Sequence, residues 1–481
     1  MKHFADNNQK NNEPRHSARP SDGRRFAPKD RQRPAKNPDR FEKKQTELRI
    51  KRPDAPADGA TKIYPLKKSE VAKVESRSKR PRTESVGTPT APVPPTKAGY
   101  APAFLFGGFI LAMSLLFIFL PKDDFSASEK RYLAKFPEVT AEKVFNGEFG
   151  KAFEGYFADH FPSRNLWVGV NAYSTLAEGN NGANGVYFGK DGYLINKPVS
   201  TKNQIDHNLW ILDDFKNYCL TGESAKIPMT AMFVPSTGYI ADDKLPLVHE
   251  SYHDDEFFEK VAKSLEKSGI DFVDLRETFK SAHNSGNQLY YKNDHHWTTE
   301  GAYTAYVEYC KKIGIQPASK NSFNLERYEG FLGTTYSTSG FLLNAADTLE
   351  VWNNPKNTEE KISVTIYDGK NEDTINTHSM FFDSHDSEND KYPVFLDGNH
   401  ALTTITNDNV KDGKIVVIKD SFSHCFAPFL AENFHTVILV DMRLYKGERV
   451  SDLISAEKPD QILCLYGMDN FAQDMDIPDL E

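Results

Sequence analysis

The chain has 481 residues and a formal net charge of −9, which is unevenly distributed. Residues 1–100 carry 25 Lys and Arg against 12 Asp and Glu, whereas the remaining residues carry 34 against 56. The four cysteines lie far apart and form no CxxC pair, which excludes a disulfide-rich scaffold and a zinc-finger type of site.

Residues 1–97 are rich in Pro, Lys, Arg, Asn and Ser and contain few aliphatic residues. Such a segment buries too little apolar surface to offset chain entropy, so we predict a disordered basic tail. Its basic pairs are interleaved with acids and lack aromatic neighbours. We therefore expect weak, unspecific attraction to anions and no nucleic-acid site.

Residues 101–120 contain no charged residue, and about 20 apolar residues are enough to cross a bilayer. The stretch lies too far along the chain for a secretory signal and is apolar on every face, unlike a core helix. We predict one transmembrane helix. The Lys and Arg residues within 24 positions on either side tie at five each, so the positive-inside rule does not decide the orientation. The long basic tail favours a cytoplasmic N-terminus and an extracytoplasmic domain over residues 122–481.

The segment up to about residue 179 has a helical pattern. Residues 126–136 begin with a Ser start signal, and Phe149, Phe153 and Phe157 follow one helical face. From residue 185, short β-type runs alternate with helical stretches; the runs are 186–195, 229–236, 270–275, 414–421, 435–442 and 460–468. Continuous apolar runs are typical of buried parallel strands, so we predict an α/β fold with an open parallel sheet and flanking helices.

The sequence NDHHWT at 293–298 is the strongest candidate for chemistry. On a loop, Asp294 and His296 can project to the same side. A carboxylate that fixes the imidazole tautomer lets the other ring nitrogen act as a general base. The alternative is a polar loop whose histidines cap the following helix.

Ser421 is the second candidate, because the apolar run 414–419 leads directly into it and helical residues follow. Ligands bind beyond the carboxyl ends of strands in open α/β sheets. A Ser at that position lies near free backbone N–H groups that can stabilise an oxyanion. The alternative is an ordinary helix N-cap. The Asp/His pair elsewhere in the domain favours a Ser-His-Asp arrangement.

The NDHHWT segment resembles the signature of the DHHW-motif family. The likeness continues in eight further stretches of the region after the apolar segment: FSASEKRYLAKFP (125–137), FADHFPSR (157–164), GVYFGKDGYLI (185–195), VPST (234–237), GTTYS (333–337), LDGNHAL (396–402), VIKDSFS (417–423) and YGMDNF (466–471). The family resembles the SGNH-hydrolase-like proteins of alginate O-acetylation, which use an Asp-x-His pair early in the domain and a Ser late in it.

By this resemblance Asp294 would orient His296, His296 would activate Ser421, and Ser421 would be acylated. His295 would shape the loop or contact substrate. The sequence departs from the family in having Lys419 where a glycine usually precedes the Asp-Ser pair.

The resemblance implies O-acetyl transfer to a cell-envelope polysaccharide, with no cofactor and with a membrane-bound acyltransferase as the source of acetyl groups. One alternative is a polysaccharide acetyl esterase, in which water replaces the sugar hydroxyl. The other is a non-catalytic glycan-binding or envelope assembly protein, in which the DHHW loop is structural.

Four further residues are candidates for the oxyanion site or for substrate binding. Asn470 follows the run 460–466, where an SGNH-type asparagine is expected, and Asn399 is a second amide. Arg443 follows the run 435–442 and suits an anionic or sugar substrate. Trp297, with two neighbouring tyrosines at 290 and 291, offers a stacking face for a sugar ring. The alternatives are turn residues, a surface cation and a core side chain.

A metal site is the competing interpretation of the histidines. Asp294, His295 and His296, with His400 or His424, include suitable ligands. Adjacent histidines rarely reach the same ion, and nothing has HExxH spacing, so we expect no metal.

Overall fold

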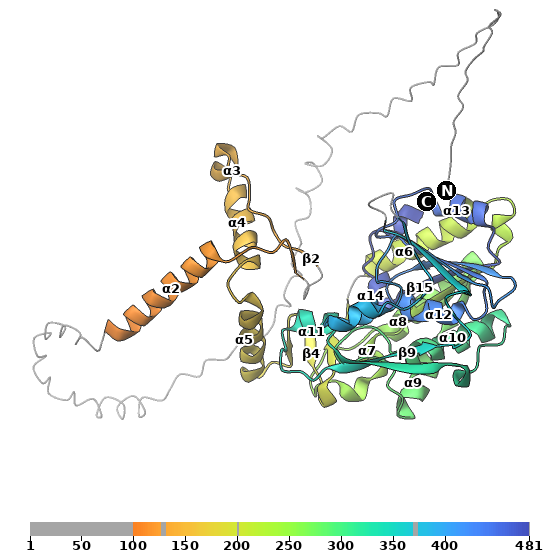
Figure 1. The fold of residues 1–481 in the computed structure, drawn as a ribbon, viewed down its shortest axis with the longest axis horizontal. Helices are drawn as coiled ribbons and strands as arrows, with labels where there is room; N and C mark the ends of the chain where they lie inside the picture. The colour runs from red at the N-terminus through yellow and green to blue at the C-terminus, as the bar shows by residue number, and fades with distance from the viewer. Residues whose placement is uncertain (1–99, 127–130, 200–201, 369–373, 481) are drawn as a thin grey trace, which may run out of the picture. The chain divides into compact units, whose positions relative to one another are not determined.

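The computed structural model describes residues 100–126, 131–199, 202–368 and 374–480 (Figure 1). The tail predicted to be disordered, residues 1–97, lies outside the described residues. Among the described residues, α2 (Ala101–Phe119) is the one helix long and apolar enough to cross a membrane, and none of its residues is buried. Its length and composition are compatible with the predicted single-pass anchor.

The segment between this helix and residue 179 is only partly as predicted. The helix expected over residues 126–136 is wrong, because β1 (Phe125–Ser126) and β2 (Arg131–Tyr132) pair as antiparallel strands and their backbone bonds replace those of a helical turn. Three helices follow: α3 (Ala141–Phe145), α4 (Glu148–Asp159) and α5 (Arg164–Ala177). On α4 the rings of Phe149 and Phe153 stack at 5.9 Å, which confirms the predicted helical face.

An eight-stranded sheet forms the centre of the fold, in the order β11-β10-β12-β14-β13-β15-β6-β7. Five neighbouring strands are parallel: β14 (Thr436–Asp441), β13 (Lys414–Lys419), β15 (Gln461–Gly467), β6 (Met229–Val234) and β7 (Asp271–Asp274). These are the strands that the continuous apolar runs predicted. The α/β prediction is confirmed.

Three antiparallel strands extend the sheet and were not predicted: β12 (Leu402–Asn407), β10 (Ile362–Tyr367) and β11 (Thr374–Thr377). Buried and more exposed residues alternate along β10 and β12, as in strands with one apolar face. Such strands lack the continuous apolar runs on which the prediction relied.

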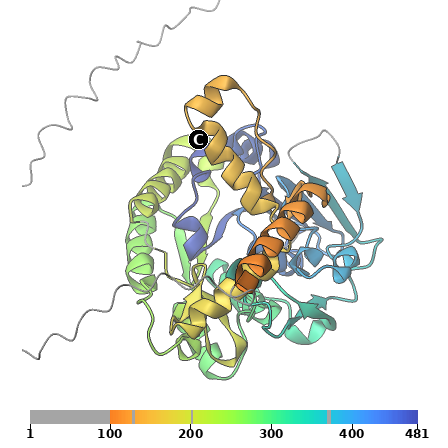
Figure 2. The same cartoon turned by 90° about the vertical axis from the view of Figure 1, so that its left-hand side faces the viewer.

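Helices cover both faces of the sheet (Figure 1). Along β13, Ile415 and Val417 enter one core with residues of α9 (Arg276–Asn284), α10 (Thr299–Ile313) and α12 (Ser423–Leu430). Val416 and Ile418 enter a second core with residues of α6 (Lys202–Asp214), α8 (Asp254–Ser268) and α13 (Val450–Glu457). Figure 2 shows the same elements turned by 90°, with the yellow-green helices α6 and α8 together along one side.

The run 186–195 does not enter the central sheet. It forms two strands, β4 (Val186–Phe188) and β5 (Leu194–Asn196), which belong with β3 (Gly182–Ala183) to a small antiparallel sheet. Asp191 and Gly192 adopt positive φ angles of 55° and 79°, so the chain turns between the two strands. A two-stranded sheet of β8 (Asn324–Phe331) and β9 (Asp347–Asn353) and the short helices α7 (Thr237–Ile240), α11 (Thr334–Ser339) and α14 (Met468–Phe471) complete the region discussed below.

Candidate active site

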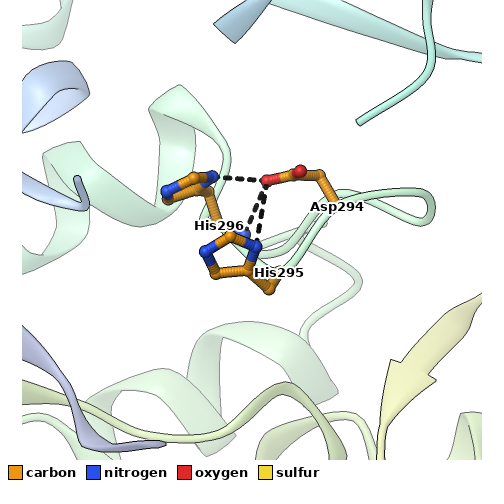
Figure 3. Close-up of side chains that lie close together, drawn as sticks. All are labelled: Asp294, His295 and His296. Carbon is orange, nitrogen blue, oxygen red and sulfur yellow. Dashed lines mark hydrogen bonds and ion pairs between the residues drawn. The ribbon is translucent and has the colours of Figure 1, made fainter. Parts of the chain in front are cut away.

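Asp294, His296 and Ser421 lie in one hydrogen-bonded line. His296 Nδ1 is 2.5 Å from Asp294 Oδ1, and His296 Nε2 is 2.7 Å from Ser421 Oγ. The three residues are 1%, 4% and 8% exposed. Figure 3 shows the carboxylate of Asp294 facing the rings of His296 and His295. The structure thus brings together a carboxylate, an imidazole and a hydroxyl from segments 125 residues apart.

The loop that carries Asp294 and His296 is anchored at both ends. Before it, the buried carboxylate of Asp347 accepts hydrogen bonds from the N–H groups of Lys292 and Asn293 at 2.7 and 2.8 Å. After it, Thr298 caps α10 by accepting a bond from the Gly301 N–H at 3.2 Å. The two anchors fix the backbone of the loop relative to β9 and α10.

Asp294 is saturated with hydrogen bonds. Its Oδ1 accepts from the His296 backbone N–H at 2.9 Å, and its Oδ2 accepts from the N–H and hydroxyl of Thr334 at 2.6 and 2.8 Å. The residue before Thr334 has to be glycine, because a Cβ on Gly333 would lie 2.2 Å from Asp294 Oδ2. The GTTYS stretch at 333–337 therefore completes the carboxylate site.

The protonation pattern follows from these contacts. Burial raises the pKa of Asp294, but the neighbouring His296 and His295 outweigh it and hold that pKa well below its usual range. An ionised carboxylate accepts hydrogen bonds only, so His296 Nδ1 carries a proton. His296 Nε2 is then the acceptor that faces the Ser421 hydroxyl, as a general base requires.

Two aromatic rings hold the His296 imidazole in its plane. Tyr392 stacks on it with a centroid distance of 3.9 Å and an interplanar angle of 6°, and Phe422 meets it at 5.0 Å and 61°. The Tyr392 hydroxyl also donates to the Ser421 carbonyl oxygen at 3.2 Å. Tyr392 thus contacts both the imidazole and the serine turn.

The serine turn is organised by Asp420. One carboxylate oxygen of Asp420 accepts from the Phe422 N–H at 3.0 Å, and the other accepts from the Gly467 N–H at 2.8 Å and from Asn470 Nδ2 at 2.7 Å. These bonds connect the ends of β13 and β15. They also orient the Asn470 amide, the first of the predicted oxyanion candidates, toward the serine turn. The Ser421 side chain does not cap α12, since the N-cap of that helix is Phe422.

Lys419, the residue that departs from the expected glycine before the Asp-Ser pair, does not disturb the serine turn. Its φ is not positive, so a side chain is tolerated there. The buried Nζ donates to Asp441 Oδ2 at 2.9 Å and to His424 Nε2 at 2.7 Å. Burial lowers the pKa of Lys419, while Asp441 opposes this effect. The turn therefore accommodates a lysine, because its side chain is directed into a buried ion pair.

Arg443 and Asn399 form a second pair of candidates that contact each other. Arg443 binds both carboxylate oxygens of Asp441, at 2.8 and 2.6 Å, and donates to Asn399 Oδ1 at 3.1 Å. Burial raises the pKa of Asp441, but Lys419 and Arg443 outweigh it and bring that pKa to about 2. Arg443 thus shares the single negative charge of Asp441 with Lys419, and 37% of the Arg443 side chain is exposed.

The prediction that Trp297 offers a sugar-stacking face is wrong. The side chain is 0% exposed, its indole N–H donates to the Phe422 carbonyl oxygen at 3.0 Å, and its ring stacks on Phe426. Tyr290 and Tyr291 are buried as well. These rings fill the core beneath the loop, because burying their apolar area stabilises the fold more than exposing it.

His295 lies at the edge of the site. The Thr334 hydroxyl donates its hydrogen bond to Asp294, which leaves Thr334 Oγ1 free to accept. His295 Nδ1 is therefore the donor in the 2.7 Å hydrogen bond to Thr334 Oγ1. Burial and the adjacent His296 lower the pKa of His295 to about 4, which keeps the ring neutral at pH 7. The neutral ring is consistent with a residue that shapes the loop.

The competing metal interpretation has one possible centre among the described residues. Ligand atoms of Asp294, His295 and His296 lie within 4.8 Å of one another. An ion there would compete with the hydrogen bonds of these atoms to Thr334 and Ser421. The other two histidines considered are engaged elsewhere, His400 with Asp397 and His424 with Lys419. The donor set is therefore better suited to a hydrogen-bonded relay.

Three residues of the site were not assigned a role from the sequence. Thr334 belongs to the GTTYS stretch that supported the family resemblance, so a signal was present but no function had been attached to it. Asp469 likewise belongs to the YGMDNF stretch at 466–471, whereas Tyr392 carried no local signal. Their importance depends on which distant segments they contact.

Comparison with known proteins agrees with this geometry. Residues 260–440 match the family model described as DHHW protein, which confirms the resemblance drawn from the sequence. A probable alginate O-acetylase, AlgJ of Pseudomonas aeruginosa, is 29% identical over 174 residues, which are 34% of this chain and 41% of that protein. The chain therefore spans less than half the length of this curated relative.

Two solved structures have a similar fold. A DHHW family protein from Eubacterium siraeum matches with a TM-score of 0.52 and 21% identity, over 62% of this chain and 95% of that one. PatB1 of Bacillus cereus, solved with a sulfonyl adduct, matches with a TM-score of 0.51 and 19% identity, over 61% and 97%. This chain therefore shares its α/β fold with both proteins.

Proposed function

We propose, from the DHHW match and the arrangement of Asp294, His296 and Ser421, that this protein transfers acetyl groups to hydroxyls of a cell-envelope polysaccharide. The observation that carries the proposal is the buried line from Asp294 through His296 to Ser421, with distances of 2.5 and 2.7 Å. The name of the Pseudomonas aeruginosa relative, a probable alginate O-acetylase, supports the reaction class.

In the first half-reaction Ser421 is acylated. Its Oγ attacks the carbonyl carbon of an acetyl donor, and the hydroxyl proton passes to His296 Nε2. Asp294 stabilises the imidazolium that forms. The donor's leaving group departs with the proton from His296, and acetyl-Ser421 remains.

In the second half-reaction a sugar hydroxyl gives its proton to His296 Nε2 and attacks the acetyl carbon. The bond to Ser421 Oγ breaks, and Oγ recovers the proton. The negative charge on the carbonyl oxygen needs hydrogen-bond donors in both steps. We assign this role to the Ser421 N–H and to the Asn470 amide, because Asn470 Nδ2 has two hydrogens and Asp420 occupies only one of them.

The proposal divides the chain into three parts. Residues 1–97 form a basic cytoplasmic tail, residues 101–120 a single membrane span, and residues 122–481 an extracytoplasmic domain. Since acetyl-CoA is cytosolic, a membrane-bound acyltransferase delivers the acetyl group to Ser421. The apolar helix α2 supports the membrane location.

Two other functions use the same residues differently. With water as the acceptor, the triad makes the protein a polysaccharide acetyl esterase. A non-catalytic glycan-binding or assembly protein would need no contact between the serine and the histidine. The 2.7 Å distance from His296 Nε2 to Ser421 Oγ and the absence of a side-chain cap at the start of α12 favour the enzymes.

The test uses the full chain in detergent with p-nitrophenyl acetate as donor. We expect Ser421→Ala and His296→Ala to abolish turnover, and mass spectrometry to find the acetyl group on the Ser421 peptide of the wild type. Ser423→Ala is the matched control, because its hydroxyl donates to the Asp420 carbonyl oxygen and has no bond to His296. Turnover that persists in Ser421→Ala would refute serine chemistry.

A further inference from the structure

A small pocket lies beside the serine turn, at the carboxyl ends of β6 and β15. Its free volume is about 40 Å³. The residues that carry the argument among those lining it are Asn196, Ser236, His295, Phe422, Asp469 and Asn470. Phe422 follows the serine directly, and Asn470 binds Asp420, so the pocket opens next to the reacting centre.

Two side chains that line this pocket have a buried polar atom without a hydrogen-bond partner, the hydroxyl of Thr335 and the carboxylate of Asp469, and Asp469 is the one that carries a charge. Its Oδ1 is buried and has no hydrogen-bond partner among the described residues. An unpaired buried carboxylate oxygen is costly, so such groups usually mark a ligand or a functional role. The nearby acid Asp254 differs, because the N–H and hydroxyl of Ser236 donate to its carboxylate at 2.6 to 2.7 Å.

The size of the pocket limits what it can hold. One water needs roughly 10–15 Å³ of such volume, so about 40 Å³ accommodates a few waters or one small substituent. A hydroxymethyl group is of this size. Such a group also supplies an O–H donor for the Asp469 carboxylate.

We propose that the pocket receives the hydroxymethyl group of a neutral sugar in the acceptor, with Asp469 accepting a hydrogen bond from its hydroxyl, so that neutral sugars are acetylated in preference to uronic acids. This inference rests on the proposed acetyl transfer. It also fixes the product: the acetyl group goes to a ring hydroxyl, since O6 lies in the pocket.

The charges around the pocket exclude a uronate carboxylate. The lining contains no Lys or Arg, and His295 is neutral. Arg443, the cation considered for an anionic substrate, is bound to Asp441 and does not line the pocket. A carboxylate placed against Asp469 would therefore meet a like charge, with no Lys or Arg in the lining to bind it.

The preference for neutral sugars over uronic acids should increase with pH. Burial raises the pKa of Asp469 to about 7, and the neighbouring Asp254 adds to this shift. The other titratable groups that interact with Asp469 are Tyr252 and Tyr290, whose phenols have pKa values raised by burial and stay neutral here. Above pH 7 Asp469 is mostly ionised and repels a uronate more strongly.

The experiment compares two acceptors that differ only at C6, methyl β-D-glucopyranoside and methyl β-D-glucopyranosiduronate. Each is added to the full chain in detergent with p-nitrophenyl acetate at pH 7.5, and acetylated glycoside is quantified by mass spectrometry and located by NMR. We expect at least a tenfold preference for the glucoside, with the acetyl group on a ring hydroxyl. Asp469→Asn should reduce the preference to threefold or less. Asp452→Asn, an exposed acid paired with Arg449, should preserve it.

The outcomes separate the two proposals. No p-nitrophenol release and no acetyl-Ser421 would refute the proposed function itself. Release without acetylation of the glucoside would overturn the inference, as would equal use of both acceptors or acetylation at O6. A preference that Asp469→Asn leaves unchanged would overturn it too, while leaving the serine chemistry intact. The preference is a ratio within one variant, so a general loss of activity does not mimic the result.

Discussion

Replacing Asp294 by asparagine tests the proposed relay at its least exposed member. The carboxylate accepts four hydrogen bonds, two from His296 at Oδ1 and two from Thr334 at Oδ2. Asparagine has the same shape but one accepting and one donating end. If its oxygen faces His296, its NH₂ meets the Thr334 N–H. If its NH₂ faces His296, Nδ1 must accept, and the proton moves to Nε2.

Either orientation has a defined consequence. Each leaves a buried N–H without its acceptor, that of Thr334 in the first and that of His296 in the second, which destabilises the fold by about 1–3 kcal/mol. In the second, His296 Nε2 carries a proton and cannot take the one on Ser421. General-base assistance contributes about 10²–10⁴ in rate, so we expect kcat to fall by about that factor. KM for a small ester should change little, because Asp294 is buried and does not contact the substrate.

The assay combines p-nitrophenyl acetate kinetics with urea unfolding of the full chain in detergent. The pKa of Asp294 is lowered in the folded state, so its stabilising contribution is present above the unfolded pKa near 3.9 and is lost as pH falls below it. The stability gap between wild type and Asp294→Asn should therefore narrow below pH 4. A kcat within threefold of wild type, with Asp452→Asn as control, would refute the reasoning about the tautomer.

Three further predictions concern the surroundings of the relay. Gly333→Ala should lower kcat at least tenfold and the melting temperature measurably, because the new Cβ would lie 2.2 Å from Asp294 Oδ2; wild-type kinetics would contradict the close packing. Asp469→Asn should stabilise the fold more at pH 8 than at pH 4, since a folded pKa of about 7 against an unfolded value near 3.9 destabilises the fold by up to about 4 kcal/mol once the group ionises; urea unfolding at both pH values would detect it, and an equal effect would speak against the raised pKa. Thr298→Val removes the cap bond from Gly301 and should lower the unfolding free energy by about 1 kcal/mol, measured by the same method; no change would mean that water replaces the cap.

The strands of the parallel sheet could be predicted because their signal is local. The segments 414–419, 436–441 and 461–467 are continuous apolar runs, and burial on both faces makes such runs recognisable without knowledge of the neighbours. The antiparallel strands were missed for the same reason, since alternating residues on β10 and β12 resemble many exposed segments.

The errors fall where tertiary contacts override a local pattern. Trp297 directly follows Asp294, His295 and His296, and this position in the sequence does not distinguish a surface ring from a core ring. In the structure its indole N–H binds the Phe422 carbonyl oxygen, and the ring lies in the core. The Ser start signal at 126 did not produce a helix, because the segment pairs with residues 131–132 as a strand.

The sequence by itself determined the transmembrane-type segment, the α/β class and the types of residue in the relay. Asp294 and His296 are two residues apart, so their contact is a local property of the loop. Their contact with Ser421 is not local, because it depends on β13 ending opposite the loop that precedes α10. The tertiary structure alone decided which residues from distant segments surround the relay. Thr334 binds Asp294, Tyr392 stacks on His296, and Asp469 lines the neighbouring pocket. Their proximity is set by strand register and core packing, which involve the whole chain rather than any short stretch of it.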